Sequence, residues 1–490
     1  MATTIIPNNA AINARRRGRV FNWFDRRAGI DSLLHEAFDE PIPGGARLAY
    51  VFGSGLLFLF LSQIITGVFL ALYYVPSADH AHTTIAYITK EVMAGSFLRS
   101  LHSYGSSAMV VVLILHLMQT FLYGSYKGRR ELLWVSGCVL FALVIAMAFT
   151  GYLLPWDMKA YFATTVGTNI AGEMPLVGES IKRLMRGGND MGSLTLSRFF
   201  VAHVFLIPAA IFGLVAMHVY LFRKAGAAGP ISEHPIDPKQ KTEKFYPRQL
   251  LMDLGFGLAL IAALGLLSYL APVELGPKAD PADTQYLPRP EWYYLPVFQW
   301  LKYWQGSRAV IGIIVIPLIV IAMFVGLPFV DRRLERRPWK RPVAVATFAI
   351  VFFSLVGLGA LSYRDDHRDP GIAAQLAKQH EDTEQFMRAS FEPEPSEASL
   401  AAANVALADP LAAQGKAIFE AQSCNACHGD GGAGTAAGAK LTGIGAKFPA
   451  DKLTGLLKQP TDKMTAGGMT AVEISDQEMK ALVAYLNSLK

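Results

Sequence analysis

The chain alternates between long apolar runs and polar segments, and seven of the runs are long enough to cross a bilayer core of about 30 Å. They span Leu48–Tyr74, Leu101–Tyr123, Leu132–Leu154, Phe199–Phe222, Leu250–Leu270, Val310–Leu327 and Val343–Leu361. Runs of this length predict membrane-spanning helices. We therefore expect an all-α protein, with a seven-helix transmembrane bundle followed by a small C-terminal domain.

Composition agrees with a membrane protein. The 490 residues are 52% hydrophobic and only 17% charged, against about 25% charged in soluble domains. The net charge of +6 reflects basic loops, and no interleaving of basic and aromatic residues points to nucleic acid. We expect contact with membrane lipid and no nucleic-acid partner.

Basic residues gather in the loops on one side of the bundle, which the positive-inside rule makes cytoplasmic. They are Arg15, Arg16, Arg17, Arg19, Arg26, Arg27, Arg47, Lys127, Arg129, Arg130, Arg223, Lys224, Lys239, Lys241, Lys244, Arg248, Arg332, Arg333, Arg336, Arg337, Lys340 and Arg341. We expect a cytoplasmic N-terminus without a cleaved signal peptide, and seven crossings then place the C-terminal domain outside the cytoplasm. Residues 21–38 mix apolar and charged positions, which is typical of an interfacial helix or a cytoplasmic one.

Four histidines lie within two of the apolar runs. His102 and His116 are fourteen residues apart, and His203 and His218 are fifteen apart. At about 1.5 Å rise per residue, each pair returns to nearly one helix face with its members roughly 21 Å apart. Because ionisable residues inside a membrane are costly, they indicate function. Each of the two helices offers one histidine at each of two levels, which predicts that the histidines bind two haem irons. The alternative is that they form hydrogen bonds to a neighbouring helix.

Glycines repeat the same spacing in the neighbouring runs. Gly53 and Gly67 are fourteen residues apart, as are Gly137 and Gly151. A flat macrocycle between helices requires missing side chains at both levels, although small residues also serve ordinary helix packing. The matched spacings favour haem.

The C-terminal domain contains a Cys-x-x-Cys-His motif at residues 424–428. In this pattern Cys424 and Cys427 bind haem covalently and His428 binds the iron, whereas a redox disulfide is the rival interpretation. We expect Met469, shortly before the last helix, to be the sixth ligand, with Met464 as the alternative. The third cysteine, Cys138, is interpreted as packing, so any iron–sulfur carrier must be a separate subunit.

One further motif, Pro290-Glu291-Trp292-Tyr293, lies in the outward-facing connection between the fifth and sixth runs. With the histidines and glycines, it makes the first 360 residues resemble cytochrome b of the quinol:cytochrome c oxidoreductases, the cytochrome bc complexes. The C-terminal domain resembles a class I cytochrome c. The seven-helix count and the second histidine spacing are closer to the cytochrome b and subunit IV pair of plastoquinol-oxidising complexes, fused here. Residues 41–45 hold no cysteine, so the extra covalent haem of that type is not expected.

The resemblance implies two non-covalent haem b groups and one covalent haem c. His102 and His203 would hold the outer, low-potential haem b, and His116 and His218 the inner, high-potential one. Arg99 would pair with a haem propionate, unless it is an ordinary interfacial arginine.

The resemblance also implies two quinone sites. Glu291 would accept a proton from quinol, and Tyr293 and residues 152–162 would line the same outer site. On the cytoplasmic side Arg223 and Asp253 match positions near quinone reduction, although each could equally be a solvated charge.

The resemblance implies a domain division. Residues 1–45 would form a cytoplasmic arm with an interfacial helix, 46–230 a four-helix diheme domain, 231–363 a three-helix subunit IV-like domain and 411–490 the cytochrome c domain. The polar composition and charge clusters of residues 364–410 predict a linker, with room for one surface helix.

The implied function is quinol oxidation with electron bifurcation and proton translocation across a bacterial inner membrane. One electron goes to a Rieske iron–sulfur partner and then to the fused haem c, and the other crosses the b haems to quinone. A homodimer and a downstream c-type cytochrome or other acceptor are expected. The alternative is a diheme anchor that relays electrons from another dehydrogenase to the tethered cytochrome c.

Overall fold

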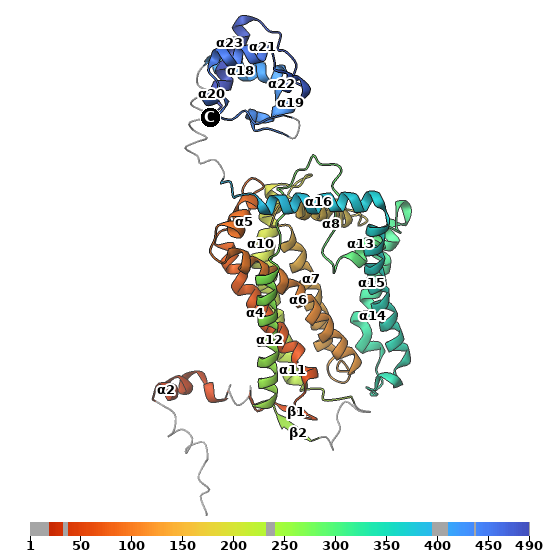
Figure 1. Cartoon of the computed structure of the whole chain (residues 1–490). Coiled ribbons are helices and arrows are strands. Elements are labelled where there is room, and N and C mark those ends of the chain that lie inside the picture. Colours follow the sequence, from red (N-terminus) through yellow and green to blue (C-terminus); the bar gives the residue numbers. More distant parts are fainter. Residues whose placement is uncertain (1–18, 33–37, 232–240, 394–409, 436–437, 490) are drawn as a thin grey trace, which may run out of the picture. The chain divides into compact units, whose positions relative to one another are not determined.

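The computed structural model describes residues 19–32, 38–231, 241–393, 410–435 and 438–489. The chain divides into two compact units, one ending at Phe391 and the other starting at Glu392 (Figure 1). Most of the expected N-terminal arm before residue 19 and the linker residues 394–409 lie outside the described residues.

Seven helices of the described chain are long and apolar enough to cross a membrane. This confirms the predicted all-α fold and the seven spans. The spans are α4 (Val51–Ala71) after the short helix η1 (Leu48–Tyr50), α6 (Gly95–Leu122), α7 (Glu131–Tyr152), the continuous run α10 (Ser193–Val201), η2 (Ala202–Leu206) and α11 (Ile207–Ala225), α12 (Arg248–Leu270), η4 (Ile311–Val315) with α14 (Ile316–Val330), and α15 (Pro342–Arg368).

Two of the spans contain a π-helical turn immediately before a proline. The N–H of Ile207 bonds the carbonyl of Ala202, five residues earlier, and Pro208 follows. The N–H of Ile316 does the same with Ile311, before Pro317. Proline lacks an N–H and crowds the preceding turn. The wider π turn accommodates the proline ring and the lost backbone hydrogen bond without ending the helix.

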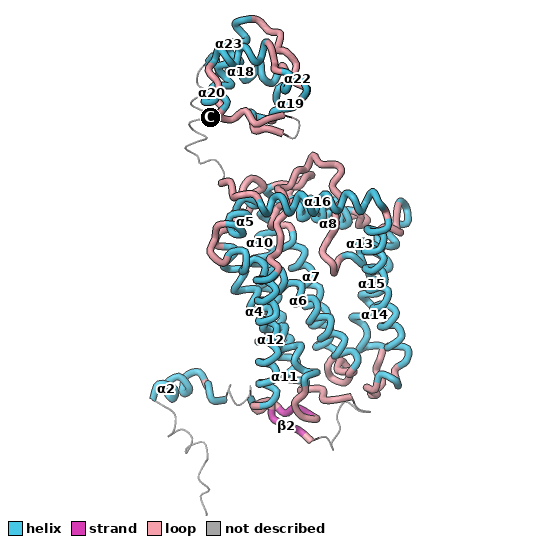
Figure 2. The backbone as a smooth tube through the Cα atoms, in the orientation of Figure 1, coloured by secondary structure: helices cyan, strands magenta, loops and turns pink. Residues whose placement is uncertain are grey.

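Short helices cover one end of the bundle (Figures 1 and 2), which we call the outer end. They are α5 (Ala81–Lys90), α8 (Met158–Gly172), α9 (Gly178–Arg186), α13 (Leu295–Leu301), η3 (Gly306–Arg308) and α16 (Pro370–Arg388). Helix α8 begins where Asp157 accepts a hydrogen bond from the N–H of Ala160 at 2.8 Å, an N-cap contact.

Helix α16 folds back onto this outer end. Asp369 accepts bonds from the N–H groups of Gly371 and Ile372, which separates α16 from α15. Phe386, Met387 and Phe391 then pack against a core that includes Leu153 and Leu275. The segment expected from residue 364 as a linker with one surface helix therefore first continues α15 to Arg368, and the surface helix is α16, which is docked and ends at Arg388.

The opposite end of the bundle, the inner end, carries a two-stranded ribbon. Strand β1 (Pro41–Pro43) pairs antiparallel with β2 (Thr242–Lys244), with Ile42 opposite Glu243. The ribbon joins the segment after α2 (Arg19–Ala28) to the connection between α11 and α12.

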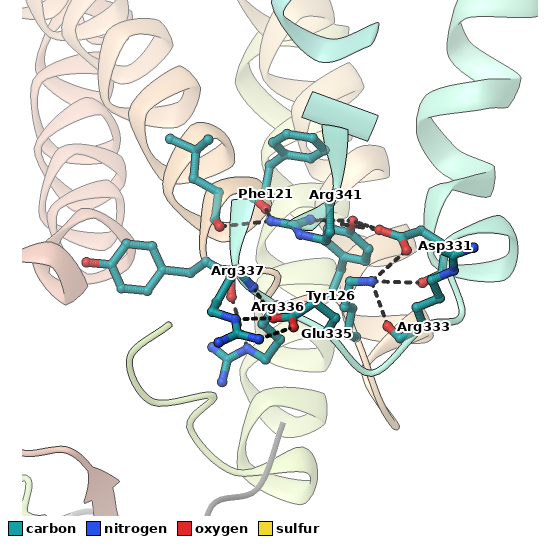
Figure 3. A network of polar contacts seen from close by, with 11 residues as sticks. Phe121, Tyr126, Asp331, Arg333, Glu335, Arg336, Arg337 and Arg341 are labelled. Atoms are coloured by element: carbon teal, nitrogen blue, oxygen red, sulfur yellow. Dashed lines mark hydrogen bonds and ion pairs between the residues drawn. The ribbon is translucent and has the colours of Figure 1, made fainter. Parts of the chain in front are cut away.

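The α14–α15 connection, which contains η5 (Pro338–Lys340), docks on the first four spans through charged side chains (Figure 3). Arg336 is 1% exposed and donates to the carbonyls of Tyr123, Ala228 and Gly229. Helix carbonyl ends carry partial negative charge, so a buried guanidinium there is compensated.

Two more contacts complete this junction. Arg341 donates to the carbonyls of Phe121 and Leu122 at the end of α6. Lys127 forms a 2.6 Å ion pair with Asp331, which also accepts a hydrogen bond from the hydroxyl of Tyr126. We call the contacts of Lys127, Asp331, Arg336 and Arg341 the arginine junction.

The second unit consists of α18 (Pro410–Ala421), α19 (Cys424–His428), η6 (Asp430–Gly432), α20 (Ile444–Lys447), α21 (Ala450–Lys458), α22 (Asp462–Ala466) and α23 (Asp476–Ser488). Helices α18 and α23 cross closely, because a side chain at Gly415 would overlap the carbonyl of Ala481. Phe419, Leu482 and Tyr485 form its buried core.

Candidate functional site

The four predicted histidines meet in pairs between α6 and the η2–α11 span. The ring centres of His102 and His203 are 6.2 Å apart, with planes at 75°. His116 and His218 lie in the same two spans, fourteen residues after His102 and fifteen after His203. The two levels expected from the spacing are therefore present.

Each predicted glycine lies beside a histidine of the neighbouring helix. An added Cβ would lie 3.1 Å from Cε1 of His102 at Gly67 and 3.5 Å from Cε1 of His116 at Gly53. Gly137 stands in the same relation to His218, at 3.4 Å, and at Gly151 the Cβ would overlap the ring of His203. The four glycines thus lie at the two histidine levels, where their spacing predicted them, and their clearance for a macrocycle stays a prediction.

Three of the histidines have an identifiable tautomer. Thr66 Oγ1 lies 2.9 Å from Nδ1 of His102 and donates its own proton to the carbonyl of Ser62. Ser136 Oγ lies 2.8 Å from Nδ1 of His218 and donates to the carbonyl of Leu133. Because each hydroxyl already donates its proton to a carbonyl, the hydroxyl oxygen must accept the hydrogen bond and Nδ1 must donate it.

His203 reaches the same state through a backbone acceptor. Its Nδ1 lies 3.0 Å from the carbonyl oxygen of Met147 and 3.3 Å from Thr150 Oγ1. A carbonyl only accepts, so Nδ1 carries the proton. In all three rings Nε2 is left with its lone pair, which is the state that binds a metal.

The outer pair also has the separation that an iron requires. Two metal–imidazole bonds of about 2 Å, plus half a ring on each side, place the ring centres about 6 Å apart, close to the 6.2 Å between His102 and His203. Arg99, one turn before His102, is buried and donates to the carbonyl of Val273. Its Nε is buried with no partner among the described residues, so it fits an added carboxylate such as a haem propionate.

The Pro290–Tyr293 motif lies at the outer end. Glu291 Oε1 is 2.7 Å from Nζ of Lys159, at the start of α8. The ring of Tyr293 contacts that of Tyr294, with centres 4.7 Å apart. Burial raises the pKa of both phenols well above the ordinary value, so Tyr293 stays protonated at neutral pH and can donate a hydrogen bond.

This motif is connected to the outer histidine level through α7. Tyr294 donates to the carbonyl of Ile145 at 2.8 Å, and its ring contacts that of Phe149. The next residue, Thr150, contacts His203. Tyr152, from the segment predicted to line the same site, donates to the carbonyl of Arg289 at 3.3 Å.

The two predicted inner-end residues occupy different settings. Asp253 is buried and accepts a hydrogen bond from Gln249 at 2.8 Å, and Gln249 accepts from the N–H of Arg47. Arg223 lies 3.4 Å from Glu40 and is partly exposed. Asp253 belongs to a buried network, and Arg223 to a half-exposed ion pair.

In the second unit, Cys424, Cys427 and His428 lie together on α19, and the two cysteines are not joined by a disulfide. Burial raises the pKa of the Cys424 thiol. His428 Nδ1 lies 2.7 Å from the carbonyl of Ala439, so Nδ1 is protonated and Nε2 is available. Met469 packs against the same core as Cys424, whereas Met464 is not among the described residues that contact this core.

The sequence interpretation missed the hydroxyl partners of the histidines and the lysine beside Glu291. A signal existed for the first group, because Thr66, Ser136 and Thr150 each directly precede one of the predicted glycines. For Lys159 there was no local signal, since its partner is 132 positions away.

The fold and these side chains define a membrane cytochrome. The family model described as Cytochrome b/b6/petB matches residues 37–226, the one described as Cytochrome b(C-terminal)/b6/petD matches 278–378, and that of Cytochrome c matches 412–490. The chain belongs to the cytochrome b family of bc complexes, with a cytochrome c domain in the same polypeptide. Haem b and haem c are the cofactors that these domains imply.

Individual relatives agree. The menaquinol:cytochrome c reductase cytochrome b subunit of Bacillus subtilis is 40% identical over 221 residues, 44% of this chain and 99% of that protein. The cytochrome bc complex cytochrome b subunit of Chlorobaculum thiosulfatiphilum is 36% identical over 328 residues, 65% of this chain and 75% of that protein. A solved hyperthermophilic respiratory complex III chain matches with TM-score 0.63 and 26% identity, over 75% of this chain and 96% of that one.

Proposed function

We propose that the chain is the core subunit of a quinol:cytochrome c oxidoreductase that oxidises membrane quinol at its outer end. The observation that carries this proposal is the packing of the Glu291 loop on α7: Tyr294 contacts Phe149, and the adjacent Thr150 contacts His203. The proposed proton acceptor, Glu291, is thereby connected to the outer histidine pair through Tyr294 of the same loop and two adjacent residues of α7. A relay anchor that oxidises no quinol has no use for this arrangement.

The chain would hold three haems, which supply the one-electron chemistry. His102 with His203 and His116 with His218 would bind two non-covalent haem b groups, and Arg99 would pair with a propionate of the outer one. Haem c would be attached at Cys424 and Cys427. His428 and Met469 would be its axial ligands, a pair that raises the potential of a haem.

The outer-site residues would bind the quinol and move its proton. Glu291 would take the proton of a quinol hydroxyl, since a carboxylate at a water-accessible position is a suitable general base. The protonated phenol of Tyr293 would donate a hydrogen bond to the substrate. At the inner end, the buried Asp253 and the half-exposed Arg223 would serve quinone reduction.

The two electrons of the quinol would separate at the outer site. One would pass to a Rieske iron–sulfur partner and then to the fused haem c, which tethering keeps at high effective concentration. The other would cross the two b haem levels to quinone. Proton release outside and uptake inside would make the reaction a proton translocation.

We place the protein in a bacterial inner membrane, with the inner end in the cytoplasm and the cytochrome c domain in the periplasm. The support is the basic inner end, where Lys127, Arg130, Arg336 and Arg341 gather, and the bacterial relatives. A homodimeric complex, membrane lipid around the seven spans, and a downstream c-type cytochrome complete the proposed assembly.

The experiment is quinol-driven haem reduction in the purified complex, with the inner quinone site inhibited and the b and c absorbance bands followed separately. We compare wild type with Glu291→Gln, and use Glu274→Gln, at a half-exposed outer-end carboxylate, as the matched control. Both bands should reduce rapidly in wild type and in the control, and both should slow in Glu291→Gln. Normal b reduction in Glu291→Gln, or none in wild type, would favour the relay anchor.

A further inference from the structure

Glu291 has a charged partner that comes from a distant part of the chain. Lys159 Nζ, from the first turn of α8, lies 2.7 Å from Glu291 Oε1. The same ammonium lies 5.7 Å from the ring centre of Tyr152, whose hydroxyl donates to the carbonyl of Arg289. Lys159 therefore connects α8 to the loop that carries the proposed proton acceptor.

This ion pair faces water and is breakable. The side chains of Lys159 and Glu291 are 46% and 33% exposed. Ion pairs at such exposure are weak, because solvent screens the attraction and two long side chains lose freedom in forming them. The carboxylate can therefore leave Lys159 at small cost when another partner is offered.

The backbone around Glu291 is held far more firmly. Arg289 forms a two-point contact with Asp366 of α15, at 2.7 and 2.8 Å, and these side chains are only 19% and 10% exposed. On the other side, Tyr294 is anchored to Ile145 of α7 at 2.8 Å. With the chain fixed on both sides, side-chain rotation is the freedom that Glu291 retains.

We propose that Lys159 is the positioning residue that defines the outward, proton-releasing orientation of Glu291; this rests on the proposed function. In the cycle, the Glu291 carboxylate leaves Lys159 and takes the quinol hydroxyl proton, so that the quinol O–H bond breaks and a carboxyl O–H bond forms. The proton of the other quinol hydroxyl would pass to water at the outer end, and the two electrons would go to the iron–sulfur partner and the outer haem, which would supply the one-electron chemistry. The carboxyl group turns back, gives the proton to water, and the charged carboxylate pairs with Lys159 again.

The test is a double-mutant cycle in the full complex, with steady-state quinol:cytochrome c reductase activity as the readout. The variants are Lys159→Met, Lys159→Arg, Glu291→Gln and the double Lys159→Met/Glu291→Gln. Lys302→Met is the matched control, because this outer-end lysine contacts the ring of Phe298 and not the Glu291 carboxylate.

Lys159→Met should lower the KM for quinol, since Glu291 no longer has to leave a partner, and should lower kcat, since the outward orientation is lost. Both changes should be roughly two- to fivefold, the range open to an exposed ion pair. Lys159→Arg should retain wild-type values, and Lys302→Met should too. In the Glu291→Gln background, Lys159→Met should change nothing further.

An equal effect of Lys159→Met in both backgrounds would overturn the inference, because Lys159 would then act independently of Glu291. So would unchanged KM and kcat in Lys159→Met. Failure of the proposed function has a different signature: wild type itself would transfer no electrons from quinol to cytochrome c, and both proposals would fall together.

Discussion

Thr66 Oγ1 accepts a hydrogen bond from Nδ1 of His102 across 2.9 Å and donates its own hydrogen bond to the carbonyl of Ser62. The hydroxyl thereby fixes both the tautomer and the orientation of the imidazole. Comparable contacts at His218 and His203 show that the arrangement recurs at both levels.

Thr66→Val should remove this bond with little change in shape. Outer-shell partners of metal ligands contribute about 10- to 100-fold in metal affinity or activity, so we expect weaker binding of one b haem and a shifted midpoint potential. A redox titration of the b bands measures both quantities. Thr165→Val, whose hydroxyl bonds the carbonyl of Tyr161, is the control, and identical titrations for the two variants would contradict the prediction.

Gly151→Ala should disturb the outer level alone. The added methyl group would overlap the ring of His203 and turn its Nε2 away from the iron. We expect the ratio of haem b to haem c to fall by half, with the covalent haem c as the internal standard. Gly213→Ala on α11 meets nothing within 4 Å and should keep the wild-type ratio; an unchanged ratio in Gly151→Ala would refute the assignment.

Met469→Ala should remove the sixth ligand of haem c. Met469 packs against the core that Cys424 also contacts, which favours it over Met464 as the ligand. We expect loss of the Met–iron absorption band and a lower haem c potential, while Met464→Ala keeps both. The reverse result would assign the ligand to Met464.

His82 should make the outer end sensitive to acid. Burial lowers the pKa of this ring below its ordinary 6.5, and its Nε2 lies 2.8 Å from the carbonyl of Gly276. As pH falls below about 6.5, the unfolded state binds the proton first, so the free energy of unfolding decreases toward the lower folded-state pKa. Above that window the ring is neutral in both states and stability is constant.

Thermal unfolding of the detergent-solubilised protein between pH 5 and 8 measures this effect. Wild type should lose more of its midpoint temperature on acidification than His82→Gln, whose amide still donates but does not titrate. His380→Gln, at an exposed position of α16, should follow wild type. Parallel curves for wild type and His82→Gln would exclude His82 as the acid-sensitive group.

Sequence periodicity was enough for the seven spans and the two histidine levels, because the helical repeat converts spacing directly into depth. The family followed from the motifs that resemble it, such as Pro290–Tyr293 and Cys424–His428. Partners such as Thr66 and His102 depend on how two helices face each other, and the Lys159–Glu291 pair depends on the packing of α8 against a distant loop. A surface helix was foreseen in the polar segment after residue 363, but its docking was not, because the apolar contacts of α16, Phe386 and Met387, come at the end of a polar helix.

The arginine junction has a consequence for how the molecule can be assembled. Arg336 and Arg341 attach the last spans to the ends of the first ones through backbone carbonyls, and these contacts need no peptide bond between the two halves. A gene divided between the first four spans and the last three should still yield a functional complex from two separately translated chains. The peptide link would then serve to keep the two halves in equal number, while their association would rest on these contacts.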